Sequence, residues 1–165
     1  MTTRKTETVR VMSGEVSTIR TEAKSASILF AIAALVSLVG LADAIYLTIE
    51  HVAGRSVRCT ITSGCSEVLA SSYATLPGNI PLAALGALAY FTAFSLATLA
   101  AFNYHVARPL LAILVGLMFL MTLWLLYVQA FVLHKFCQYC LLSAAVTITL
   151  TMLMIAARRT WWPKS

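Results

Sequence analysis

The stretch PLLAILVGLMFLMTLWLLYVQAFVL, which covers residues 109–133, contains no Asp, Glu, Lys or Arg. The hydrocarbon core of a bilayer is about 30 Å thick, and an α-helix needs about 20 apolar residues to cross it. The stretch meets that length. It therefore predicts a transmembrane helix.

Three further stretches have the same character and cover residues 27–49, 80–102 and 137–157. The last two carry no charged residue, and the first carries only Asp43. The whole chain is 60% apolar and only 11% charged, and its mean hydropathy is +0.86. These values lie outside the range of soluble globular proteins. We therefore expect an all-α integral membrane protein, a bundle of four transmembrane helices.

The basic residues indicate how the bundle is oriented. Nine of them fall on one side of the predicted spans: Arg4, Lys5, Arg10, Arg20, Lys24, Arg108, Arg158, Arg159 and Lys164. The other side holds only Arg55, Arg58 and Lys135. We expect a multi-pass protein of the plasma membrane. By the positive-inside bias, both of its termini lie in the cytoplasm. The net charge of +6 is explained without nucleic acid, since no exposed aromatic residues are interleaved with the basic ones.

The remaining segments are a polar cytoplasmic tail over residues 1–26, an outer loop over residues 50–79 and a basic cytoplasmic tail over residues 158–165. We expect little structure in the first tail. The first span is too long for a cleavable signal peptide. Within the outer loop, residues 66–73 (SEVLASSY) favour a short helix that caps the bundle and turns Val68 and Leu69 toward the membrane.

All four cysteines fall on the outer side, as Cys59 and Cys65 in the loop and as Cys137-Gln138-Tyr139-Cys140 where the fourth span begins. At a helix N-terminus, unpaired N–H groups and the helix dipole stabilise a thiolate, which is the reactive form of cysteine. His134 and Lys135 would add to that effect. The C-x-x-C pair therefore predicts thiol–disulfide chemistry.

Several short motifs accompany the cysteines: Gly64-Cys65-Ser66, Ser71-Ser72-Tyr73-Ala74, the segment 78–81, Gly86 and Tyr90. In this order they resemble the vitamin K epoxide reductase family, in its prokaryotic thiol-oxidising branch without a fused thioredoxin-like domain. The resemblance covers roughly residues 40–140. It implies a four-helix bundle around a quinone, either ubiquinone or menaquinone, and a thioredoxin-fold redox partner that acts in trans.

The resemblance also implies roles for individual residues. Cys140 would lie nearest the quinone with Cys137 as its partner, Cys65 would exchange with Cys137, and Cys59 would face the redox protein. The quinone site is expected to be lined by Ser71, Tyr73, Val68, Leu69, Leu125 and Cys140. One position departs from the pattern, because Ala144 stands where the vertebrate enzymes carry a tyrosine that hydrogen-bonds the naphthoquinone.

The predicted function is a thiol:quinone oxidoreductase that oxidises its partner outside the membrane and so supports disulfide-bond formation. Two alternatives stay open. The first is a quinone or vitamin K epoxide reductase whose product is the reduced quinone. The second is a non-catalytic membrane scaffold in which the cysteines form structural disulfides. The C-x5-C and C-x2-C spacings fit a zinc site poorly, so no metal is predicted.

Polar residues at the outer ends of the spans are candidates for proton transfer. Asp43, an intramembrane acid, is a candidate relay to the quinone, and the alternative is a hydrogen-bonded packing contact. His134 and His51 are candidates for accepting thiol protons, and the alternative for both is an ordinary interfacial position. Aromatic residues of the spans, such as Tyr90 and Trp124, either line the quinone site or pack against lipid.

Overall fold

The computed structural model describes the backbone of residues 2–54, 75–76 and 80–161, and the side chains of residues 24–54 and 81–158. The long helices are α1 (Thr2–Val52), α3 (Leu82–Ala101), α4 (Ala107–Tyr127) and α5 (Gln138–Trp161). A π-helix, η1 (Val128–Leu133), continues α4. Two short strands, β1 (Thr75–Leu76) and β2 (Ile80–Pro81), pair antiparallel before α3.

Four segments of these helices are long and apolar enough to cross a membrane: Lys24–Val52, Leu82–Ala101, Ala107–Leu133 and Gln138–Arg158. The prediction of an all-α four-helix membrane bundle is therefore confirmed. One expectation was wrong. Residues 2–23, for which we expected little structure, belong to helix α1, which begins at Thr2. These residues include no proline, and the apolar span behind them supplies the helical nucleus that is costly to form in isolation.

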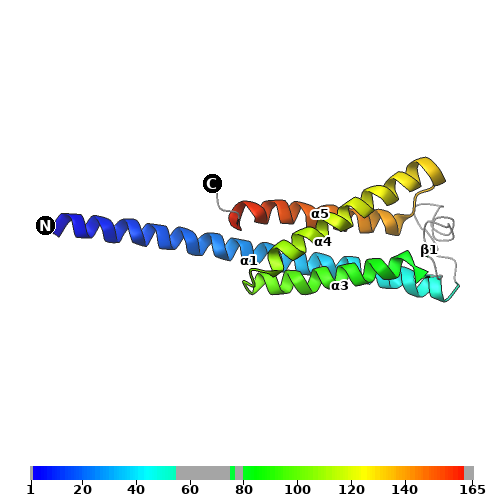
Figure 1. Cartoon of the computed structure of the whole chain (residues 1–165), viewed down its shortest axis with the longest axis horizontal. Helices are drawn as coiled ribbons and strands as arrows, with labels where there is room; N and C mark the ends of the chain where they lie inside the picture. Colours follow the sequence, from blue (N-terminus) through cyan, green and yellow to red (C-terminus); the bar gives the residue numbers. More distant parts are fainter. Residues whose placement is uncertain (1, 55–74, 77–79, 162–165) are drawn as a thin grey trace.

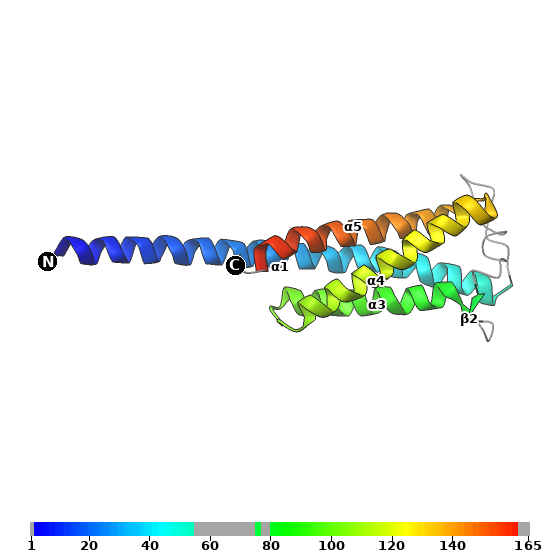
Figure 2. The same cartoon turned by 45° about the horizontal axis from the view of Figure 1, so that its top comes forward.

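The helices form a closed ring in which α1 packs against α3 and α5, and α4 packs against the same two helices. Figures 1 and 2 show all four running along the long axis, with α1 continuing past the bundle toward the N-terminus. The two termini point to one end of the bundle. Helix η1 and the start of α5 lie at the other end (Figure 1).

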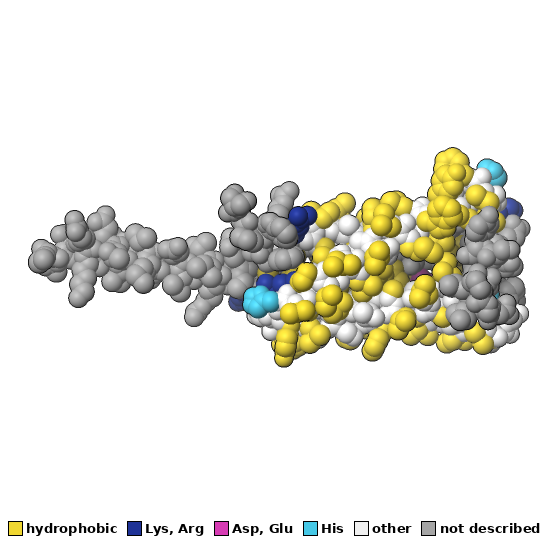
Figure 3. Space-filling model, in the orientation of Figure 1, with side chains coloured by type: hydrophobic (Ala, Val, Ile, Leu, Met, Phe, Trp, Pro, Cys, Tyr) yellow, Lys and Arg dark blue, Asp and Glu magenta, His cyan; other side chains and the backbone are white. Residues whose placement is uncertain are grey.

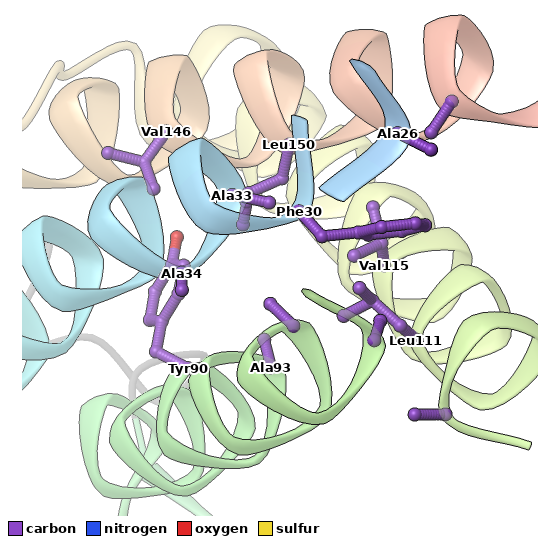
Figure 4. Packing of buried hydrophobic residues seen from close by; sticks show 14 of the residues in the cluster. Ala26, Phe30, Ala33, Ala34, Tyr90, Ala93, Leu111, Val115, Val146 and Leu150 are labelled. Carbon is purple, nitrogen blue, oxygen red and sulfur yellow. The ribbon is translucent and has the colours of Figure 1, made fainter. Parts of the chain in front are cut away.

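Small residues line the contact between α1 and α3. On α1 they recur at intervals of three or four residues, as Ala33, Ser37, Gly40 and Ala44. Ala33 and Ala44 belong to one buried cluster with the α3 alanines Ala93, Ala97 and Ala100, and Gly40 lies against Tyr90 of α3. Small side chains let helix backbones approach closely where lipid offers no hydrophobic drive for association. Figure 4 shows this core, in which Ala33, Ala34 and Ala93 lie among larger side chains such as Phe30, Tyr90 and Leu150.

The outer surface of the bundle is apolar, as lipid contact requires. Large side chains such as Leu88, Ile113 and Met152 are more than 60% exposed. In the space-filling view of Figure 3, hydrophobic side chains follow the bundle along its length, whereas the described histidines and basic residues lie toward its two ends. In a soluble protein such a surface would drive aggregation, but in a membrane protein it is the surface that contacts lipid.

The α3–α4 turn lies at the same end as the termini and is closed by Asn103, whose φ of 66° ends the helix. The N–H of Asn103 donates to the carbonyl of Ala100 and that of Tyr104 to the carbonyl of Leu99, which is a Schellman motif. Arg108 is buried here. It donates to Oδ1 of Asn103 at 2.8 Å, and its guanidinium lies 5.6 Å from the centre of the Phe30 ring.

Candidate active site

The two membrane cysteines stand at the first turn of α5. The carbonyl of Cys137 accepts the N–H of Leu141 at 3.0 Å, so Cys137 is the residue that caps the helix. Its sulfur in turn accepts the backbone N–H groups of Tyr139 and Cys140. A side-chain acceptor at this position satisfies donors that otherwise lack a partner. The local structure thus holds a sulfur where a negative charge is favoured.

Both thiols are free, and they hydrogen-bond with each other. Cys137 has no exposed surface, whereas Cys140 is half-buried. The hydrogen bond from Cys140 lowers the pKa of Cys137 from 9.0 to about 7; burial opposes that effect, and the backbone N–H groups of Cys140 and Tyr139 reinforce it. Cys137 is therefore the acidic member of the reduced pair.

A cavity of about 140 Å³ lies beside Cys140 and is bounded by all four helices. Most of its wall is apolar, and Leu47, Leu126 and Ala144 are representative. Seven polar side chains also reach it: Asp43, His51, Tyr90, Thr122, Gln129, Cys140 and Ser143. Cys137 packs behind Cys140, against Leu47, Leu133 and Tyr139. One sulfur of the pair thus faces the cavity, and the other is held in the protein behind it.

Asp43 is the cavity's unsatisfied polar group. Only 8% of the residue is exposed, and its Oδ2 atom has no hydrogen-bond partner among the described residues. Burying a polar atom without a partner costs free energy, so such an atom in a cavity points to a ligand that completes it.

Tyr90 forms another wall of the cavity and connects two helices. Its hydroxyl donates to the carbonyl of Ser143 at 3.0 Å and hydrogen-bonds with the hydroxyls of Ser143 and Thr147 at 2.8 and 3.0 Å. Its ring occupies the space over Gly40, where an added Cβ would come within 2.5 Å of the ring. Figure 4 shows the hydroxyl directed from α3 toward α5. Gly40 is therefore needed for this side chain to lie where it does.

Gln129 is a polar site residue that the sequence did not predict, as are Thr122 and Ser143. It lies in η1, is 2% exposed, lines the cavity and accepts the backbone N–H of Cys137 on Oε1 at 3.2 Å. One signal was available, because Gln129 and Gln138 are the only amide side chains in the four apolar stretches. The π-helical turn that aims it inward has no signature in a 3.6-residue hydrophobic period.

The structure brings several predicted site residues together. Leu125 and Cys140 line the cavity, as do both Asp43 and His51. His134 is exposed, adopts φ of 49° where η1 ends, and is not among the described residues of the cavity wall. The predicted helix 66–73 lies outside the described residues, and so do these predicted site residues: Cys59, Cys65, Val68, Leu69, Ser71 and Tyr73.

The arrangement suits redox chemistry on a flat ring. An apolar cavity of about 150 Å³ is large enough to hold benzene, and the volume here is similar. A quinone ring adds carbonyl oxygens, which need hydrogen-bond donors, and the few polar groups on the wall offer them. Within the described part of the chain, no group of three or more His, Cys, Asp or Glu side chains is placed to hold a metal ion.

Comparison with known proteins agrees with this chemistry. A family model described as the vitamin K epoxide reductase family matches residues 31–155, a range that includes all four cysteines and the whole cavity wall. A search of curated proteins gave no match.

Proposed function

Because the chain belongs to the vitamin K epoxide reductase family of membrane quinone and disulfide oxidoreductases, we propose that it oxidises a thioredoxin-fold protein outside the membrane and reduces a quinone. The single observation that carries the proposal is the position of the C-x-x-C pair. Cys140 lies on the wall of an apolar cavity, and Cys137 lies behind it at the cap of α5.

The overall reaction converts two thiols and a quinone into a disulfide and a hydroquinone. A quinone bound in the cavity accepts two electrons and two protons and leaves as the hydroquinone. Cys137 and Cys140 supply the electrons and end joined by an S–S bond. The two thiol protons account for the two that the product gains, so no other oxidant or reductant is needed.

The two cysteines divide the work according to their surroundings. Cys140 is the electron donor, because it is the cysteine of the pair that lines the cavity. Cys137, whose pKa of about 7 leaves it substantially ionised at neutral pH, supplies the thiolate that closes the disulfide.

Asp43 supplies a proton to the quinone oxygen. Burying a charge among apolar side chains is costly, so we take the carboxyl to react as the neutral acid, which can donate its O–H. Its unpartnered oxygen in the cavity is the supporting observation. His51 follows Asp43 by two turns of α1 on the same cavity wall and is a candidate to return the proton toward the outside.

Electrons reach the membrane pair through the loop pair. The thiolate of the reduced partner attacks Cys59 of a Cys59–Cys65 disulfide and frees Cys65, which then attacks Cys137 and releases Cys140. The second thiol of the partner then attacks the mixed disulfide with Cys59 and displaces Cys59. Cys59 attacks Cys65 in the Cys65–Cys137 disulfide and frees Cys137. The partner leaves with a disulfide, and both cysteines of the C-x-x-C pair are reduced. This order rests on the family resemblance.

Vitamin K epoxide reduction is less well supported. Ala144, which replaces the quinone-binding tyrosine of the vertebrate enzymes, does line the cavity. Its methyl group offers no hydrogen bond, so this wall cannot orient a naphthoquinone in the vertebrate manner.

The test is quinone reduction by the purified protein, supplied with a reduced thioredoxin-fold protein and with ubiquinone or menaquinone analogues in turn. We expect Cys137→Ala and Cys140→Ala each to abolish turnover, because one sulfur cannot close a disulfide. Cys59→Ala and Cys65→Ala should lose turnover with the protein donor and keep part of it with a small dithiol. Thr149→Ala, on the exposed face of α5, is the matched control and should retain full activity.

The same assay tests Asp43. Asp43→Asn keeps the size and a hydrogen-bond donor but has no acidic proton, so kcat should fall at least tenfold with little change in KM. Substantial turnover in either membrane cysteine variant would contradict the central proposal. Unchanged kcat in Asp43→Asn would remove only the proton-donor role.

A further inference from the structure

Gln129 is the buried polar residue of η1 that contacts both members of the cysteine pair. Its Oε1 accepts the backbone N–H of Cys137 at 3.2 Å, and its side chain hydrogen-bonds the thiol of Cys140. The other buried polar or charged residues of the described chain are Ser37, Asp43, Arg108 and Thr147, and no hydrogen bond joins any of them to a cysteine.

The contact with Cys137 fixes which way the amide points. A backbone N–H can only donate, so the atom facing Cys137 must be the amide oxygen. The S–H of Cys140 is donated to Cys137, so the sulfur of Cys140 has only lone pairs to offer Gln129, and its partner is the amide –NH₂ group. Because an amide nitrogen only donates, the sulfur of Cys140 is the acceptor of this hydrogen bond.

The backbone of η1 holds the side chain in that orientation. The carbonyl of Gln129 accepts the N–H of Lys135 at 3.2 Å, which closes the turn between η1 and α5. The residue is only 2% exposed, so its amide has no access to bulk water. Short π-helical segments often occur where a helix must redirect a side chain into a functional site.

A donor aimed at Cys140 matters because of what surrounds that sulfur. The N–H groups at the start of α5 are directed to Cys137, and the cavity beside Cys140 is mainly apolar. A hydrogen bond to the charged form of a group stabilises it, and such bonds are stronger than neutral ones. Gln129 therefore provides for Cys140 what the helix N-terminus provides for Cys137.

We propose that Gln129 is a positioning residue of the thiol–quinone reaction: its amide oxygen holds Cys137 at the cap of α5, and its amide nitrogen stabilises the thiolate that Cys140 becomes when the Cys137–Cys140 disulfide is opened. The inference rests on the proposed function for its role in turnover. The hydrogen bond to the sulfur can be tested without quinone or redox partner.

The direct test measures Cys140 alone, in full-length protein in which Cys59, Cys65 and Cys137 are each replaced by serine. Alkylation of Cys140 by a small neutral maleimide is followed against pH by mass spectrometry. Gln129→Leu should move the midpoint upward by about one pH unit, which lowers the thiolate fraction at neutral pH about tenfold. Ser37→Ala, which removes a buried hydroxyl far from the pair in sequence, should leave the midpoint unchanged.

Gln129→Glu is a second variant, which tests the proposal even if Gln129→Leu does not fold. Glutamate has nearly the same shape and can still accept the N–H of Cys137, but it has no N–H for Cys140 and brings acidic oxygens near the sulfur. Its midpoint should rise at least as far as that of Gln129→Leu. An unchanged midpoint in both variants would overturn the proposal.

Turnover supplies a second readout. In the otherwise native protein, Gln129→Leu should reduce kcat about tenfold at pH 7, and the rise of kcat with pH should move to higher pH by about the same one unit as the alkylation midpoint. A purely structural defect would lower kcat without moving its dependence on pH. If the alkylation midpoint shifts but the native protein reduces no quinone, the proposed function is wrong and the hydrogen bond from Gln129 to Cys140 is supported. If the native protein reduces quinone but the midpoint does not shift, the proposed function is supported and the hydrogen bond is wrong.

Discussion

At the scale of single residues, the chemistry depends on where each sulfur lies relative to donors. Cys137 caps α5 and accepts two backbone N–H groups in addition to the thiol hydrogen bond of Cys140. The start of the fourth apolar stretch predicted a helix N-terminus at the pair, and this prediction held for Cys137. It did not predict Gln129, because that contact joins η1 to α5 across a turn that the sequence pattern does not define.

The lowered pKa of Cys137 leads to a prediction about pH. In reduced protein lacking the loop cysteines, the ultraviolet absorbance of the Cys137 thiolate should rise with pH through a midpoint near 7. Cys140→Ala removes the hydrogen bond that lowers this pKa most, so the midpoint should move toward higher pH and the thiolate absorbance at pH 7 should fall.

Cys140→Ser is the matched control for that measurement. Its hydroxyl still donates a hydrogen bond to the Cys137 sulfur, so the midpoint should stay close to that of the parent protein. Equal midpoints in the alanine and serine variants would show that the neighbouring side chain does not control the acidity of Cys137.

At the scale of helices, length and hydropathy predicted the four spans, because a transmembrane helix must satisfy its backbone internally and present apolar side chains to lipid. Pairing between helices was harder to foresee. Small residues on α1 and α3 were visible in the sequence, but which of them meet depends on the rotation of each helix, which hydropathy does not specify. The sequence did not predict the extension of α1 to Thr2, because a polar composition such as that of the segment before the first span indicates little structure.

Gly40 provides the test of the α1–α3 contact. A Cβ at this position would lie 2.5 Å from the Tyr90 ring, so Gly40→Ala should displace the ring and weaken its hydrogen bonds to α5. Overpacking of this kind typically costs about 1–3 kcal/mol. We expect a lower midpoint of thermal unfolding in detergent and, since Tyr90 lines the cavity, a raised KM for quinone.

Gly116→Ala is the matched control, because no atom lies within 4 Å of the Cβ that would be added on the exposed face of α4. Alanine favours a helix over glycine by about 0.5–1 kcal/mol, so this variant should be as stable as the parent or more stable. A Gly40→Ala protein that gained stability in the same way would show that α1 and α3 are not packed closely at Tyr90.

At the scale of the whole molecule, the even number of spans places both termini at one end and the C-x-x-C pair at the other (Figure 1). Which end faces the cytoplasm follows from charge. Lys24 and Arg158 are the end residues of the first and fourth spans on the side of the termini, whereas Lys135 lies between η1 and the start of α5, beside the thiols. Arg108 is buried in the α3–α4 turn, yet it belongs to the same end as the termini and keeps the bias in the same direction.

The positive-inside bias predicts that this end is cytoplasmic and that the thiols work outside, where disulfides persist. Reporter fusions to the full chain after Ser165 test the orientation, because green fluorescent protein exported unfolded stays dark outside a bacterial membrane and alkaline phosphatase is active only there. The fluorescent fusion should be bright and the phosphatase fusion inactive. Fusions after Gly54, which follows α1, should show the opposite pattern. An active phosphatase after Ser165 would put the cysteine pair on the cytoplasmic side, where it could not oxidise an external partner, and the proposed direction of electron flow would have to be abandoned.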